Sequence, residues 1–156
     1  MVGEISPDAA YRFWRDLPNL PKFMERIESL EVLASGRSRW RLRVPTGLAL
    51  SWDADVVEDR VSEVIRWQSV EGSEVLNRGV VRFRPAPGDQ GTEISVELEY
   101  VPPAGEVGRL ASFLSNQALE VQLERDLRRL KQLLEVGEIV LSDARVRRER
   151  QEGDRR

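Results

Sequence analysis

The chain contains neither cysteine nor histidine among its 156 residues. Without cysteine there is no disulfide, no thiolate nucleophile and no cysteine-based metal site. Without histidine the chain lacks the commonest general base and the usual zinc or iron ligand. The sequence therefore predicts no metal site and no cofactor, and it assigns no catalytic residue.

Long apolar runs, a signal-peptide pattern and glycine-rich phosphate loops are also missing. A membrane-spanning helix needs about 20 predominantly apolar residues in succession. The formal net charge is −3, whereas nucleic-acid-binding domains are usually basic. We expect a cytoplasmic protein with no membrane span and no nucleic-acid partner.

The N-terminal part of the sequence has helical periodicity. Ser6, Pro7 and Asp8 predict the start of a helix, because serine caps helices and proline suits the first helical position. The stretch "PKFMERIESL" predicts a second short helix over 21–30. The apolar residues on its buried side would be Phe23, Met24, Ile27 and Leu30.

From about residue 31 the hydrophobic period changes to two, which is typical of strands. The six predicted strands cover 31–35, 38–44, 48–58, 63–70, 74–85 and 91–101. Short turns between them predict an antiparallel meander with one buried face. A turn at 45–47 sets Trp40 opposite Trp52, and the hairpin near residue 88 sets Phe83 opposite Ile94. Both registers place apolar residues inward and opposite charges outward.

The C-terminal part predicts a long helical region that ends near Glu135, with Gly137 as its cap. Its apolar residues form two stripes, offset by one position. The stripes are Val107, Leu110, Ala111 and Leu114, then Leu119, Leu123, Leu127, Leu130 and Leu134. The offset at 115–117 predicts a kink or interruption. The charged residues 142–156 predict a disordered tail.

This order of elements resembles the START-like superfamily, specifically its bacterial polyketide cyclase/dehydrase and coenzyme-Q-binding branch. The resemblance is carried by "AYRFWRDLPNLPKFM", "SRWRLRVPTG", "SWDADVVED", "VIRWQSVEGSEVLNRGVVRFRPAPGDQGTEISVELEYVPPAG" and "LERDLRRLKQLLEVGEI". It implies an α+β helix-grip fold over 1–141, in which a curved antiparallel sheet wraps around the C-terminal helix. Two short helices would follow the first strand, which here could only be "MVGEI". The space between sheet and helix would be the ligand cavity.

The inward-facing residues are the candidates for that cavity. Large aromatic residues dominate this face, and they could either line a pocket or fill a core, since each buries about 150–250 Å². The candidate ligand-binding residues are Trp40, Leu42, Leu50, Trp52, Trp67, Ser69, Phe83, Val96, Leu98, Tyr100, Leu110, Leu114 and Gln117. Asp53 and Asp55 lie on the outward face, where Arg39 is opposite Asp53, so we interpret them as part of a charged surface ladder.

Three functions fit these features. The first is binding or carriage of a small apolar molecule, such as a quinone, a lipid or a polyketide-like compound. The second is an aromatase/cyclase-type enzyme in the same cavity, with Tyr100 as the acid and Gln117 or Ser69 assisting. The third is an interaction module without a ligand. A homodimer through an exposed sheet edge is a further expectation.

Overall fold

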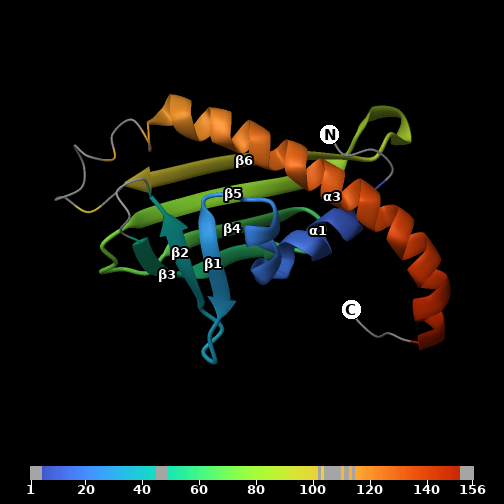
Figure 1. The fold of residues 1–156 in the computed structure, drawn as a ribbon, viewed down its shortest axis with the longest axis horizontal. Coiled ribbons are helices and arrows are strands. Elements are labelled where there is room, and N and C mark those ends of the chain that lie inside the picture. Colours follow the sequence, from blue (N-terminus) through green and yellow to red (C-terminus); the bar gives the residue numbers. More distant parts are fainter. Residues whose placement is uncertain are drawn as a thin grey trace.

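The computed structural model describes residues 5–44, 49–101, 103, 110, 113 and 115–151. Its elements are α1 (Pro7–Arg15), the 3-10 helix η1 (Leu17–Lys22), β1 (Ile27–Val32), β2 (Ser38–Arg43), β3 (Ala49–Arg60), β4 (Val64–Ser69), β5 (Leu76–Pro85), the 3-10 helix η2 (Pro87–Asp89), β6 (Thr92–Val101) and α3 (Asn116–Gln151). The six strands pair in sequence order, and every pair is antiparallel. Figure 1 shows α3 running along β6, with its C-terminal part extending beyond the sheet.

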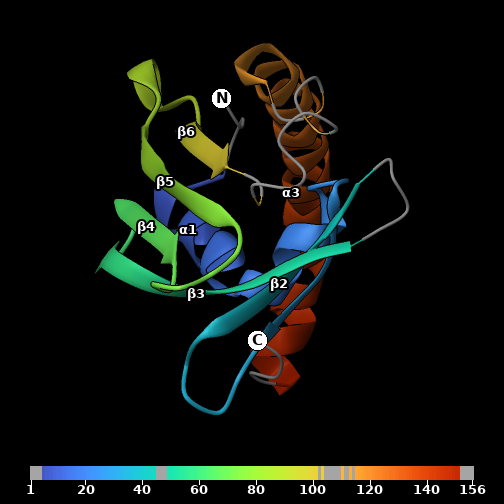
Figure 2. The same cartoon turned by 90° about the vertical axis from the view of Figure 1, so that its left-hand side faces the viewer.

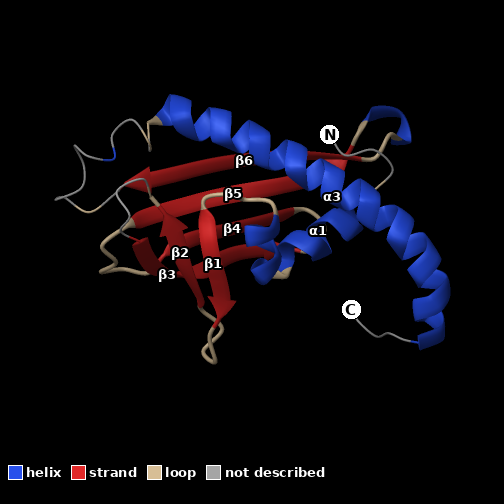
Figure 3. Ribbon diagram, in the orientation of Figure 1, coloured by secondary structure: helices blue, strands red, loops and turns tan. Residues whose placement is uncertain are grey.

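The sheet curls into a half-barrel, and the helices close its open side. In Figure 2, α1 lies within the curve of the sheet while α3 stands across the opening. Figure 3 shows α1 and α3 on the same side of the strands. This arrangement is the expected α+β helix-grip fold.

The start of α1 follows the capping signal in the sequence. The Ser6 hydroxyl accepts a hydrogen bond from the Ala9 amide at 3.0 Å, and Pro7 occupies the first helical position. The helix turns Ala10, Tyr11 and Trp14 into the core. The residues that precede Ile5 in the expected first strand lie outside the described residues. The Ile5 carbonyl itself accepts a hydrogen bond from Thr92 Oγ1 in β6.

The helix predicted over 21–30 is wrong, because residues Ile27–Val32 form β1. A bulge shifts the register of β1 against β2 between Ile27 and Ser29. One extra residue in a strand changes the spacing of inward positions. Ile27 and Leu30 therefore both face inward although they are three apart, a spacing that the sequence pattern also allows for a helix.

The predicted registers of the two hairpins are confirmed. Trp40 pairs with Trp52 across β2 and β3, and Phe83 pairs with Ile94 across β5 and β6. The loop 45–47 itself lies outside the described residues. On β5, Gly79 provides the space for a large neighbour, since a Cβ there would lie 2.5 Å from Trp67 Cζ2.

The long C-terminal helix begins where the sequence predicts an interruption. The Ser115 hydroxyl accepts a hydrogen bond from the Ala118 amide at 3.1 Å, as an N-cap does. The predicted end at Gly137 is wrong, because α3 continues to Gln151. A glycine inside a helix costs only about 1 kcal/mol relative to alanine, and glutamates and arginines, which favour helices, follow it. The domain boundary at 141 and the disorder of the tail beyond it stay predictions.

Candidate functional site

One side of α3 is attached to the chain before β1 by polar contacts. Arg129 Nε donates to the Phe23 carbonyl at 3.2 Å, and the Glu25 amide donates to Asp126 Oδ1 at 3.3 Å. Gln122 Nε2 lies 3.3 Å from Glu25 Oε1 and donates to it. These contacts fix α3 against the β1 side of the half-barrel.

The other side of α3 meets β6 through apolar side chains only partly removed from water. We call this set the β6–α3 seam. It consists of Ile94, Val96, Leu98 and Tyr100 from β6, and of Leu119, Leu123 and Leu127 from α3. Every one of them is half-buried, whereas Val81 and Phe83 on the adjacent strand are buried. The inward face of β6 is thus less completely covered than the centre of the sheet.

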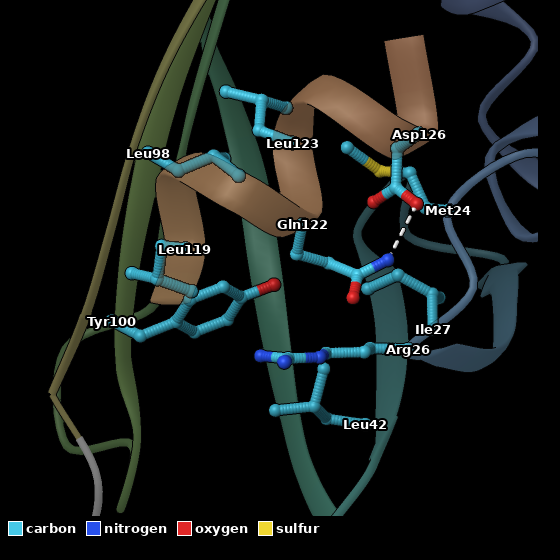
Figure 4. A pocket seen from close by; sticks show the side chains of 10 residues that line it. All are labelled: Met24, Arg26, Ile27, Leu42, Leu98, Tyr100, Leu119, Gln122, Leu123 and Asp126. Atoms are coloured by element: carbon cyan, nitrogen blue, oxygen red, sulfur yellow. Dashed lines mark hydrogen bonds between the residues drawn. The ribbon is translucent and has the colours of Figure 1, made fainter. Parts of the chain in front are cut away.

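A small cavity lies at the Tyr100 end of the seam, beneath α3 (Figure 4). Its volume is about 30 Å³. The residues around it are Met24, Arg26, Ile27, Leu42, Leu98, Tyr100, Leu119, Gln122, Leu123 and Asp126. A single water occupies about 30 Å³ in the liquid, whereas sites for drug-sized ligands measure about 300–1,000 Å³. In this conformation the cavity has space for water and not for a large organic ligand.

Four polar side chains from three parts of the chain converge on this cavity (Figure 4). Arg26 precedes β1, Tyr100 lies next to the last residue of β6, and Gln122 and Asp126 lie one turn apart on α3. Asp126 is only 5% exposed. Its Oδ1 accepts hydrogen bonds from Gln122 Nε2 at 2.9 Å and from Arg129 Nη2 at 3.3 Å. Burial nevertheless raises the pKa of the Asp126 carboxyl, which outweighs these stabilising contacts.

Burial also shifts the pKa values of Tyr100 and Arg26, the two groups opposite Asp126. It raises the pKa of the Tyr100 hydroxyl, and the negative charge of Asp126 adds to that rise. It lowers the pKa of Arg26, although the neighbouring Asp126 opposes the change. The Arg26 guanidinium donates to the Phe113 carbonyl at 2.8 Å and lies 3.7 Å from the centroid of the Phe113 ring. The cavity therefore combines an acid of raised pKa, a neutral phenol and a fixed cation.

The structure places the predicted cavity residues in different surroundings. Leu42, Leu98 and Tyr100 line the cavity, and Val96 belongs to the seam. The others that are buried pack in the core, namely Trp40, Leu50, Trp52, Trp67, Ser69, Phe83 and Leu110. Gln117 is exposed on the first turn of α3 and does not line the cavity. Leu114 lies outside the described residues.

Ser69 has a structural partner in place of a ligand. Its hydroxyl accepts a hydrogen bond from the Asn77 amide at 3.1 Å. The Asn77 side chain in turn accepts from Trp67 Nε1 and donates to the Glu99 carbonyl, at 3.2 Å in both cases. Asn77 is fully buried and these bonds satisfy it. Through these hydrogen bonds, Ser69 and Asn77 connect neighbouring ends of β4, β5 and β6.

Sequence reasoning missed the polar residues of the cavity. Gln122 and Asp126 follow Leu119 and Leu123 by three residues, so they share the face of the apolar stripe, and this spacing was a usable signal. Arg26 gave no such signal, because the expected helix over 21–30 placed it away from the apolar face. The ligand-binding role of all these residues stays a prediction.

The outward carboxylates form the expected charged ladder. Arg39 Nε lies 2.9 Å from Asp53 Oδ1, and Arg37 Nε lies 3.1 Å from Asp55 Oδ1. Within the described part of the chain, no three acidic side chains are grouped so that they could hold a metal ion. No described helix is long and apolar enough to cross a membrane.

A curled antiparallel sheet closed by a C-terminal helix over an internal cavity defines the helix-grip class of α+β proteins. Residues 4–131 match the family described as polyketide cyclase/dehydrase and lipid transport, and the chain belongs to this START-like family. Among curated proteins, none matches the sequence significantly.

Solved structures share the fold. The protein DR_A0006 from Deinococcus radiodurans is 38% identical, with a TM-score of 0.67 over 87% of this chain and 93% of that one. TTHA0849 from Thermus thermophilus is 24% identical, with a TM-score of 0.60 over 82% and 88%. The di-domain ARO/CYC protein StfQ of the steffimycin biosynthetic pathway is 14% identical, with a TM-score of 0.58 over 84% of this chain and 47% of that one. At these last two identities the likeness concerns the fold alone.

Proposed function

We propose that the protein binds a small apolar molecule between β6 and α3, with the polar end of the ligand in the cavity. The observation that carries this proposal is the β6–α3 seam, in which two facing apolar surfaces are only half-buried. Apolar surface left partly in water favours association with an apolar partner, by about 25 cal/mol per Å² that the ligand removes from water. The quinone, lipid and polyketide-like compounds named from the sequence all have this character.

A ligand of that size requires the seam to widen, since the cavity measures about 30 Å³. The attachment of α3 is asymmetric, and this asymmetry gives a route. On the β1 side α3 is held by the hydrogen bonds from Arg129 and Glu25. On the β6 side the described contacts are leucine packing, which a ligand can replace with its own apolar surface at little cost. Separation of α3 from β6 would then admit the ligand and leave the polar attachment in place.

The polar side chains would orient the bound molecule. The Arg26 guanidinium and the Tyr100 hydroxyl are donors for a ligand oxygen, and Asp126 and Gln122 offer acceptors. A largely apolar site with a few convergent polar groups is the usual form of a small-molecule site. The ligand class that fits is an apolar molecule with one oxygen-bearing end.

The test fills the seam with a larger side chain. Leu123→Trp places an indole in the seam, whereas Val121→Trp adds an indole at an exposed position of α3 and serves as the matched control. We expect freshly purified wild-type protein and V121W to carry, or to take up, an apolar ligand detectable by native mass spectrometry with solvent extraction. We expect L123W to carry none. Equal ligand occupancy in L123W and V121W would contradict the proposal.

A second candidate is an enzyme of the polyketide cyclase/dehydrase type that acts in the same cavity. The observation that favours it is the buried Asp126, whose pKa is raised and which shares the cavity with Tyr100 and Arg26. A carboxyl of raised pKa holds its proton more tightly than an ordinary carboxyl and can pass it to a substrate oxygen, as cyclisation and dehydration require. Arg26 would stabilise the negative charge that develops on a substrate oxygen. Loss of turnover in Asp126→Asn with ligand binding retained would support this candidate, and turnover equal to wild type would exclude it.

A further inference from the structure

All four tryptophans and both tyrosines of the chain lie in one connected series of rings. The centroid of Tyr100 lies 5.7 Å from that of Trp52, which lies 5.8 Å from that of Trp40. Trp40 lies 6.0 Å from Trp67, and Trp67 lies 6.3 Å from Trp14. We call these rings, together with Tyr11, the aromatic chain.

The last step of the aromatic chain, from Trp14 to Tyr11, runs along α1. Tyr11 and Trp14 are three residues apart on one helix, so their side chains are neighbours. Both also pack on Phe83, at centroid distances of 5.9 Å and 6.3 Å. Through Phe83, the aromatic chain therefore continues from the cavity beneath α3 to Tyr11 in the middle of α1.

The two ends of the aromatic chain differ in their chemistry. At the inner end, Tyr100 lines the cavity, and no described residue accepts a hydrogen bond from the adjacent Trp52 Nε1. At the outer end, the Tyr11 hydroxyl donates to Asp59 Oδ1 at 2.5 Å, and Arg15 Nε donates to Asp59 Oδ2 at 2.8 Å. Although its burial opposes the effect, these two hydrogen bonds keep the pKa of Asp59 below its usual value, so the carboxylate is ionised and can accept a proton.

We propose that the aromatic chain carries an oxidising equivalent from the cavity to Tyr11, a buried residue whose hydroxyl is hydrogen-bonded to the solvent-accessible Asp59. The oxidant is a one-electron acceptor formed in the cavity, such as an organic radical on a bound aromatic compound. It takes an electron from Trp52, and the electron vacancy passes through Trp40 and Trp67 to Trp14. Indole and phenol rings are the side chains of this cysteine-free protein that one-electron oxidants attack most readily, and rings in contact exchange electrons faster than rings apart.

The vacancy ends at Tyr11 because a proton acceptor is present there. Tyr11 gives one electron to the Trp14 radical cation, and its hydroxyl proton moves to Asp59 along the existing hydrogen bond. The products are the reduced oxidant, a neutral tyrosyl radical and a protonated Asp59, so one electron and one proton are accounted for. The Asp59 side chain is 31% exposed, so an external thiol reductant can reach this end of the aromatic chain and restore Tyr11.

Trp40 and Trp67 are placed to hold the vacancy briefly, whereas Trp14 Nε1 and Trp52 Nε1 have no acceptor among the described residues. Trp40 Nε1 donates to Ser38 Oγ at 2.8 Å, and Trp67 Nε1 donates to Asn77 Oδ1 at 3.2 Å. An acceptor at the ring N–H stabilises the cation that forms when an indole loses an electron. This inference rests on the proposed function, because the oxidant forms on a molecule bound in the cavity, whereas the experiment below supplies the oxidant without that molecule.

The experiment generates the oxidant at the inner end without any ligand. Val101 is exposed and adjacent to Tyr100, and the chain has no native cysteine. A single Val101→Cys variant can therefore be labelled with a ruthenium polypyridine photo-oxidant. In a Tyr100→Phe background Tyr11 is the remaining tyrosine, so any tyrosyl signal belongs to it. We expect flash–quench transient absorption to show a tryptophan radical first and a tyrosyl radical later, with the latter also visible by electron paramagnetic resonance.

Breaks in the aromatic chain should remove the tyrosyl signal and leave the tryptophan signal. Trp67→Phe and Trp14→Phe break it at two places, so a folding defect in one leaves the other informative. Asp59→Asn should also suppress the tyrosyl radical, because the proton acceptor is lost. Phe13→Leu is the control, because the Phe13 ring packs on Phe23, at a centroid distance of 6.3 Å, and is not part of the aromatic chain. No tyrosyl radical in the intact chain, or a full tyrosyl yield in both W67F and W14F, would overturn the proposal.

Discussion

Gly79→Ala tests whether the close packing of β5 against Trp67 stabilises the fold. An added Cβ would meet three atoms at less than 3.0 Å: Trp67 Cζ2 at 2.5 Å, the Glu97 carbonyl oxygen at 2.8 Å and Leu98 Cδ2 at 2.9 Å. The Trp67 ring cannot move away freely, because its N–H is bonded to Asn77 and it stacks on Trp40. The Glu97 oxygen belongs to the backbone of β6, so a rotamer change cannot relieve that contact.

The expected loss follows from these contacts. Overpacking of a core costs about 1–3 kcal/mol of folding free energy. We expect G79A to lose about 3 kcal/mol, the upper end of that range, because neither the aromatic ring nor the backbone atom that it meets can move away easily. For a chain of this size each ~1 kcal/mol lowers Tm by about 2–4 °C, so we expect a decrease of about 6–12 °C. Thermal and urea denaturation followed by circular dichroism measure it.

A matched control separates overpacking from the mere addition of atoms. Ser95→Val adds atoms on the exposed outward face of the neighbouring strand β6, where surface changes usually stay within about 0.5 kcal/mol. A Tm for G79A within about 2 °C of both wild type and S95V, with urea slopes unchanged, would refute the reasoning from the short contacts.

Two further predictions concern α3 and α1. For Asp126, a folded-state pKa raised by burial means that the folded protein binds the proton more tightly than the unfolded chain. Ionisation of Asp126 therefore destabilises the fold fully above the folded-state pKa, and this destabilisation vanishes as the pH falls below the unfolded-state pKa. Urea titrations should show wild type gaining stability relative to Asp126→Asn as the pH falls between these two pKa values. A difference between the two proteins that does not change with pH would contradict this. Ser6→Ala removes the hydrogen bond to the Ala9 amide and should cost about 1 kcal/mol, visible in urea denaturation, with Ser6→Asp as the control that retains a capping oxygen; equal stability of S6A and S6D would argue against the cap.

The antiparallel strands could be predicted because two independent patterns agreed. Alternation fixed which residues face inward, and the pairing of Arg39 with Asp53 and of Arg84 with Glu93 fixed the register. In contrast, β1 was hidden by its bulge, because Ile27 and Leu30 lie at a helical spacing. Local pattern could not separate a bulged strand from a short helix, because both place inward-facing apolar residues three positions apart.

The sequence pattern indicated where a cavity could lie, but it indicated neither its size nor its polar lining. The inward phase correctly brought Leu42, Leu98 and Tyr100 to one place. Whether the aromatic residues line a cavity or fill a core depends on how deeply α3 sits, and that depth is set by contacts far apart in sequence, such as the bond between Arg129 and the Phe23 carbonyl. The sequence pattern contains no measure of such a distance. Asp126 shares the apolar face of α3, but a charged side chain is usually expected to be exposed to solvent.

The division of the interior into a closed aromatic core and a half-buried seam has a consequence for how such a protein can change over generations. Trp40, Trp67 and Trp14 are buried and support the sheet and α1, so substitutions there carry the full cost of a core cavity, about 3–5 kcal/mol. The seam leucines are half-buried, and exchanging them costs less. Mutational drift can therefore reshape the seam while the core keeps the chain folded, and one scaffold can acquire preferences for different small molecules in different lineages.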